Sequence, residues 1–102
     1  MRRAKVFVHG IEAGVLKEVV FSKHYVFEYN ASYTGSPISL SMPTTTQVWD
    51  FDRFPPFFDG LLPEGFQLEG LLKNQKLDRN DYFSQLITVG NDLVGNITIK
   101  PV

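Results

Sequence analysis

Short stretches in which apolar and polar residues alternate dominate the first half of the chain. Three of them are rich in β-branched and aromatic residues and predict strands, over residues 4–9, 15–21 and 24–30. In the third, Tyr25, Phe27 and Tyr29 share one face, because successive side chains point to opposite sides of a strand. The links between these segments are short, which favours an antiparallel meander.

A fourth strand is predicted over residues 37–42, where Ile38, Leu40 and Met42 alternate with two serines. A proline stands on either side of this segment, which is typical of an edge strand or a strand end. The following residues 44–54 are polar and aromatic and are expected to form a loop.

The second half of the chain carries helical patterns. Helical segments are expected over residues 57–62, 64–74 and 80–89, and a last strand over residues 93–100. Pro63 fits the boundary between the first two helical segments, because proline is tolerated in the first turn of a helix. Asn80 is the expected N-cap of the third segment. Gly90 is its expected C′ residue.

This order of elements predicts an α+β fold within a single domain, residues 1–102. We expect a small antiparallel sheet of about five strands, partly closed and barrel-like, packed with two to three short helices. The last strand must return to the sheet, and a position beside the first strand would close the sheet. With 9 Phe, 4 Tyr and 1 Trp, the core should be aromatic.

Composition and charge exclude several classes of protein. The absence of cysteine excludes disulfides and thiolate metal sites and fits a reducing cytoplasm, the expected location. A formal net charge of −1 provides no global basic field for nucleic acid or acidic membranes. No apolar run approaches the roughly 20 residues of a membrane span. Arg2 and Arg3 are interpreted as a solvated end that runs directly into a strand, so no signal peptide is expected.

The residues that usually carry chemistry do not form a catalytic pattern. His9 and His24 stand at strand ends, without the cysteines that would complete a common metal site. Ser39 and Ser41 lack the glycine elbow of a serine nucleophile. The glycine-rich segment 90–96 follows a helix, the reverse of a phosphate-binding loop. We therefore predict no catalytic, cofactor-binding or metal-binding residue, and no enzyme activity.

Trp49 is the most informative side chain outside the predicted elements. It lies with Phe51 in the expected loop, at the start of a locally acidic stretch in which residues 48–69 carry five carboxylates and one arginine. Large aromatic residues in a loop either fold back onto the core or anchor a partner, and tryptophan is enriched among interface hot spots. The sequence leaves both interpretations of Trp49 open.

Several motifs, each weak by itself, follow one another in a characteristic order. They include Pro37-Ile-Ser-Leu-Ser-Met-Pro43, Phe57-Phe-Asp-Gly-Leu-Leu-Pro-Glu-Gly65, Asp81-Tyr-Phe-Ser-Gln-Leu and Gly90-Asn-Asp-Leu-Val-Gly95. Together they resemble the N-terminal subdomain of HipA-type serine/threonine kinase toxins, over nearly the whole chain. In that family the subdomain precedes the kinase core and packs against it. A separate copy is similar to the HipS proteins of tripartite HipB–HipS–HipT toxin–antitoxin modules.

The resemblance implies a non-catalytic antitoxin that binds and inhibits a HipA- or HipT-type kinase by inserting an aromatic loop at or near its active site. The hypothetical partner-binding residues are Trp49, Asp50, Phe51, Asp52 and Arg53. It also implies a complex that includes a HipB-like DNA-binding protein, without direct contact of this chain with nucleic acid or membrane. The alternative is an accessory or scaffold subunit that modulates the kinase while the DNA-binding partner neutralises it.

Overall fold

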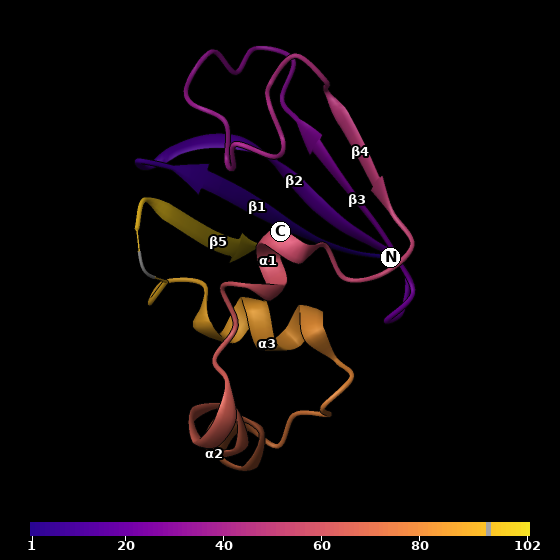
Figure 1. Cartoon of the computed structure of the whole chain (residues 1–102), viewed down its shortest axis with the longest axis vertical. Helices are drawn as coiled ribbons and strands as arrows, with labels where there is room; N and C mark the ends of the chain where they lie inside the picture. The colour runs from indigo at the N-terminus through magenta and orange to yellow at the C-terminus, as the bar shows by residue number, and fades with distance from the viewer. Residues whose placement is uncertain (94) are drawn as a thin grey trace.

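The computed structural model describes residues 1–93 and 95–102 and contains an antiparallel five-stranded sheet with three short helices (Figure 1). The strands are β1 (Arg2–Val8), β2 (Ile11–Val20), β3 (His24–Tyr29), β4 (Val48–Phe51) and β5 (Ile97–Pro101). The helices are α1 (Pro56–Asp59), α2 (Gly65–Gln75) and α3 (Tyr82–Val89). The order in the sheet is β4-β3-β2-β1-β5. The predicted α+β class is confirmed, while the sheet is open, with β4 and β5 as its edges, rather than partly closed.

The inner face of the sheet carries the core, as the alternation in the sequence predicted. Tyr25, Phe27 and Tyr29 of β3 are all buried on this face. Phe58 of α1 and Leu86 of α3 are fully buried against the same cluster. Aromatic pairs meet edge to face there, with the ring centroids of Phe27 and Tyr29 4.9 Å apart, a geometry that the ring quadrupoles favour. The expected aromatic core is therefore confirmed.

The strand predicted over residues 37–42 is wrong. These residues form bends and a turn, in which Ile38 and Met42 are buried but Leu40 is 95% exposed. No neighbouring strand pairs with the segment. Its backbone groups find other partners, because the Tyr29 hydroxyl accepts from the Ile38 N–H and donates to the Met42 carbonyl. The alternation of apolar residues here therefore reflects two buried residues, Ile38 and Met42, with the exposed Leu40 between them.

The loop predicted over residues 44–54 contains a strand. β4 pairs with β3 in a register that places Trp49 opposite Phe27 and Phe51 opposite Tyr25. Because directly opposite residues share a face of the sheet, Trp49 and Phe51 belong to the inner face. The four residues of β4 were too few to predict a strand by themselves.

Both ends of α3 differ in detail from the prediction. The N-cap is Asp81 rather than Asn80, since the Asp81 carboxylate accepts from the Ser84 N–H at 3.1 Å. Gly90 ends the helix with a φ of −57°, so it does not adopt the left-handed conformation expected of a C′ glycine. Glycine is needed there for a different reason. A Cβ atom on Gly90 would lie 2.1 Å from the carbonyl oxygen of Ile99 in β5.

The last strand returns to the sheet beside the first, as predicted. β5 pairs antiparallel with β1, and the Val102 N–H donates to the Arg3 carbonyl at 3.2 Å. The strand begins later than the predicted residues 93–100, a range that includes Val94, which lies outside the described residues. Within the described part of the chain, no helix has the length and hydrophobicity needed to cross a bilayer.

Candidate functional site

The β4 edge brings the predicted partner-binding residues to the surface in two different ways. Asp50 points to the outer face and is 68% exposed, and its carboxylate lies 2.9 Å from Nε2 of His24. Trp49 and Phe51 point inward, are half-buried and pack against the core. The indole N–H of Trp49 donates to the Thr46 carbonyl at 2.9 Å. Of the two interpretations left open by the sequence, the structure shows that Trp49 packs on the core while remaining partly exposed, and its role as an anchor for a partner stays a prediction.

Four of the five predicted residues line one shallow depression. It has a volume of about 570 Å³, and its lining is Asp50, Phe51, Asp52, Arg53 and Pro56. Trp49 does not line it. A second depression of about 360 Å³ shares Arg53 and Pro56 with the first and adds Asp59. The two depressions thus share part of their lining, and among the described residues that line them one arginine, Arg53, stands beside three carboxylates. We call the two depressions together the β4 edge site.

The charged side chains of the β4 edge site are open to solvent. Asp52 and Arg53 are exposed, which leaves their charges largely solvated. Among the described residues, no group of three or more His, Asp or Glu side chains converges in a way that would hold a metal ion. A predominantly acidic, open surface with half-buried aromatic side chains suits a complementary, basic protein surface.

The interpretation of Arg2 as part of a solvated end is wrong. Its Nε donates to Glu18 at 2.8 Å and its Nη1 to the Ser84 hydroxyl at 2.8 Å. Its Nη2 lies 2.7 Å from the carboxylate of Asp81. The position of Glu18 was the signal in the sequence that could have found this cluster. Glu18 is in phase with the buried Leu16 of β2 and is itself only 4% exposed, and a buried carboxylate needs a partner.

This cluster shifts the proton affinities of the groups around it. Burial, and then the hydrogen bond that its hydroxyl donates to Glu18 at 2.9 Å, raise the pKa of Tyr25 well above its usual value. Burial alone would raise the pKa of Asp81. The hydrogen bonds from Arg2 and Ser84 outweigh that effect and hold the Asp81 pKa below its usual value. The cluster joins β1, β2, β3 and α3, so we assign it to the stability of the fold.

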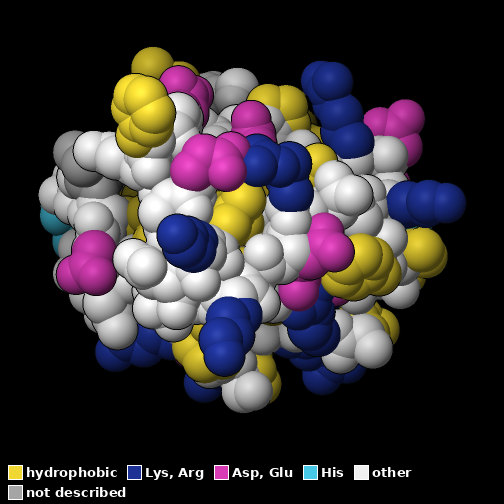
Figure 2. All heavy atoms as spheres, turned by 90° about the horizontal axis from the view of Figure 1, so that it is seen from below, with side chains coloured by type: hydrophobic (Ala, Val, Ile, Leu, Met, Phe, Trp, Pro, Cys, Tyr) yellow, Lys and Arg dark blue, Asp and Glu magenta, His cyan; other side chains and the backbone are white. Residues whose placement is uncertain are grey.

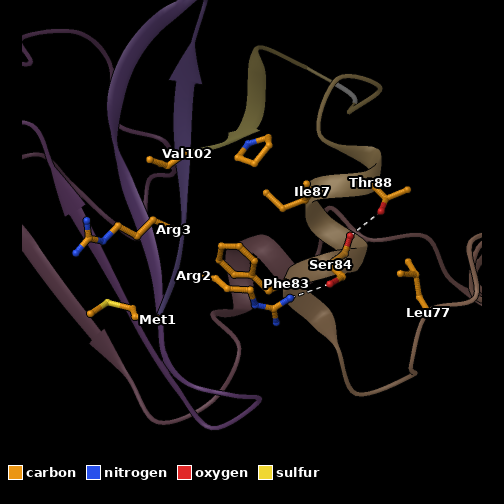
Figure 3. Close-up of a pocket in the computed structure, with 10 residues that line it drawn as sticks. Met1, Arg2, Arg3, Leu77, Phe83, Ser84, Ile87, Thr88 and Val102 are labelled. Atoms are coloured by element: carbon orange, nitrogen blue, oxygen red, sulfur yellow. Dashed lines mark hydrogen bonds between the residues drawn. The ribbon is translucent and has the colours of Figure 1, made fainter.

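A larger hollow, of about 660 Å³, lies where β1 and the end of β5 approach α3. Figure 3 shows the side chain of Arg2 reaching across it from β1 to Ser84, beside the ring of Phe83. The guanidinium carbon is 4.9 Å from the centre of that ring, within the range of a cation–π contact. The rest of the apolar lining is contributed by Met1, Leu77, Ile87, Pro101 and Val102.

The face seen from below has no continuous area of one charge. Lys and Arg side chains lie there between Asp and Glu side chains and separate hydrophobic ones (Figure 2). Phe66, on α2, is 96% exposed.

The fold is that of a small α+β domain in which an open antiparallel sheet packs with three short helices. The chain belongs to the HipA N-terminal domain family, which it matches over residues 4–100. The family resemblance read from the sequence motifs is therefore confirmed, and it places the chain in the context of HipA toxin systems.

Two individual comparisons extend over almost the whole chain. The chain is 34% identical over 100 residues to an uncharacterized protein of Haemophilus influenzae, and the match covers 98% of this chain and 92% of that protein. A solved structure of the N-terminal domain of HipA toxin is 31% identical, with a TM-score of 0.78, and the match covers 100% of this chain and 93% of that one. The likeness thus extends from β1 to β5.

Proposed function

We propose that this protein is a non-catalytic antitoxin that binds a HipA-type serine/threonine kinase toxin and inhibits it. In this proposal it is the HipS-like member of a module with a HipT-like kinase and a HipB-like DNA-binding protein. The supporting observation is the family match over residues 4–100, together with 31% identity to the N-terminal domain of HipA toxin. A domain that packs against a kinase core carries a surface complementary to that core. A separate copy of the domain can use the same surface to bind.

We propose the β4 edge site as the surface that contacts the kinase. Asp50, Asp52 and Asp59 give it an acidic character, which favours a basic surface such as one that holds phosphate groups. Charges at the solvent-exposed rim of an interface mainly speed association and align the partners. Desolvated aromatic side chains supply most of the affinity. Phe51 within the site and the half-buried Trp49 beside it on β4 are the candidates for this role.

Insertion of Trp49 into the kinase has a modest energetic cost in this structure. The side chain would give up the hydrogen bond to Thr46 and part of its packing on the core. A single neutral hydrogen bond contributes only about 0.5–1.5 kcal/mol net. Contacts of an indole ring in a closed pocket exceed that cost, since a tryptophan hot spot is worth about 2 kcal/mol or more.

The direct test is phosphorylation by the cognate kinase, measured with increasing amounts of this protein. We expect inhibition by the wild-type protein. Trp49→Ala should inhibit about 30-fold less potently, the equivalent of about 2 kcal/mol. Phe66→Ala is the matched control, because it truncates an aromatic residue that is 96% exposed on α2 and outside the proposed site. A folded Trp49→Ala protein that inhibits normally would remove Trp49 from the mechanism.

Growth of bacteria that express the kinase distinguishes the antitoxin from an accessory subunit. Rescue by this protein in the absence of the DNA-binding partner is the expected result. A protein that co-purifies with the kinase but neither rescues growth nor inhibits phosphorylation would be an accessory or scaffold subunit. Absence of binding would overturn both assignments.

A further inference from the structure

The turn over residues 37–43 presents one leucine to solvent between two buried anchors. Ile38 is 5% exposed and Met42 is 3% exposed, while Leu40 between them is 95% exposed. An isolated exposed leucine is ordinary on a protein surface. Here the arrangement is more specific. The leucine protrudes into solvent, while the residues two positions before and two positions after it are buried.

The backbone of this turn is fixed by one buried side chain. The hydroxyl of Tyr29, a residue that is 3% exposed, accepts from the Ile38 N–H at 3.0 Å and donates to the Met42 carbonyl. The Met42 N–H also donates to the Ser39 carbonyl at 3.0 Å and closes the turn. The Tyr29 ring stacks on Tyr33, with centroids 6.0 Å apart. Leu40 is thus displayed on a backbone that is ordered on both sides.

Leu40 contributes almost nothing to the stability of the isolated domain, because its side chain stays in water when the chain folds. The segment that carries it is uncharged, since residues 31–47 contain no Asp, Glu, Lys, Arg or His. An apolar side chain that protrudes from a fixed backbone requires no ordering of the backbone when a partner buries it. These are the properties of an anchor residue at an interface.

The turn is linked to the start of β4, and the β4 edge site lies at the other end of the same short strand. Tyr29, which holds the turn, also donates its backbone N–H to the Gln47 carbonyl at 2.9 Å and accepts from the Gln47 side chain at 3.2 Å. Gln47 directly precedes β4. Figure 1 shows the same loop passing over the end of the sheet and running into β4. One partner that covers the β4 edge can therefore reach the turn.

We propose that Leu40 is a second anchor for the kinase, one that enters an uncharged, apolar pocket on the kinase surface. This inference rests on the proposed function. It divides the interface into an acidic, aromatic part at the β4 edge and a neutral, aliphatic part at the turn. Loss of a buried leucine side chain weakens binding by about ten- to a hundred-fold.

Binding of purified variants to the kinase, measured by calorimetric titration, tests the proposal. Leu40→Ser should bind ten- to a hundred-fold more weakly, and Leu40→Met, which keeps the apolar volume, should bind within about threefold of wild type. Phe66→Ser is the matched control, because Phe66 is as exposed as Leu40 and lies on α2. Thermal unfolding of each variant should match wild type, since neither side chain packs on the core.

Tyr29 is a positioning residue in this scheme. Tyr29→Phe removes the hydroxyl that holds the turn and should weaken binding several-fold. In a Leu40→Ser background the same change should have no further effect on affinity, whereas a purely structural role for Tyr29 would weaken binding equally in both backgrounds.

The outcomes separate this inference from the proposed function. If the wild-type protein and Leu40→Ser bind the kinase equally well, the Leu40 anchor is overturned and the proposed function is unaffected. If Leu40→Ser and Phe66→Ser lose the same affinity, the effect is nonspecific and the anchor is again overturned. If the wild-type protein does not bind the kinase, both the proposed function and the anchor are overturned.

Discussion

Replacing Arg2 by methionine removes the cation from the cluster that joins the sheet to α3. Methionine keeps the apolar stem of the side chain but none of its donors, so the contacts to Glu18, Asp81 and Ser84 are lost together. Glu18 then remains 4% exposed, with the Tyr25 hydroxyl at 2.9 Å as its one short hydrogen bond among the described residues. The variant therefore leaves a buried carboxylate without its cation.

The geometry sets the size of the effect. Removing one partner of a fully buried ion pair costs about 3–5 kcal/mol. Water partly screens the ion pairs of Arg2 with Glu18 and Asp81, because the Arg2 side chain is 39% exposed and that of Asp81 is 20% exposed. Loss of the cation–π contact with Phe83 adds about 0.5–1 kcal/mol. After the discount for solvent, we expect the free energy of unfolding to fall by about 2–3 kcal/mol.

Urea denaturation followed by the fluorescence of Trp49, the single tryptophan, measures this loss. With a urea slope of about 1–3 kcal/mol per molar, the midpoint should fall by about 0.7–3 M. Arg3→Met is the control, since the Arg3 side chain is exposed, and it should change stability by less than about 0.5 kcal/mol. The double variant with Glu18→Gln should lose at least about 1 kcal/mol less than the sum of the single variants. Equal stability of Arg2→Met and wild type, or strict additivity, would refute this account.

Three further predictions concern glycine packing and pH. Gly90→Ala should lower stability by about 1–3 kcal/mol, because its Cβ would lie 2.1 Å from the Ile99 carbonyl oxygen. Gly70→Ala should raise stability by about 0.5–1 kcal/mol, since open space surrounds that position of α2 and alanine favours helix. Urea midpoints test both, and opposite signs would contradict the packing described. The pKa of Asp81 lies lower in the folded than in the unfolded protein, so its stabilisation is present above its ordinary value of 3.8 and is lost as the pH falls below it. Asp81→Asn should flatten that acid decline in midpoints measured between pH 3 and 7, and an unchanged decline would exclude this role of Asp81.

The central sheet was predictable because its pattern is local. Tyr25, Phe27 and Tyr29 alternate within one strand, and burial of their common face follows directly from the period of two. The pattern at Ile38, Leu40 and Met42 is equally regular, yet it has no strand beside it. Its backbone bonds go to the hydroxyl of Tyr29, a tertiary contact that no local pattern encodes. Alternation therefore identified the anchors of that segment but not its conformation.

The candidate site was predictable in composition and less so in geometry. The sequence placed Trp49, Asp50 and Phe51 together, but it could not assign them to a strand, because only the pairing with β3 makes these residues extended. Because they are neighbours in an extended strand, Asp50 and Phe51 point to opposite faces of the sheet. The role of Arg2 was hidden because its partner Asp81 is 79 positions away.

The pairing of β1 with β5 also governs when this fold can form. Ala4 is paired with Pro101, so the edge strand β5 joins a strand that is synthesised much earlier. Closure over so long a stretch of chain is slow, because its entropy must be lost before the contacts can form. Until β5 leaves the ribosome, the outer edge of β1 has no neighbour and can pair with other nascent chains. We expect the protein to acquire its folded stability only after synthesis of β5, and to depend on protection of β1 until then.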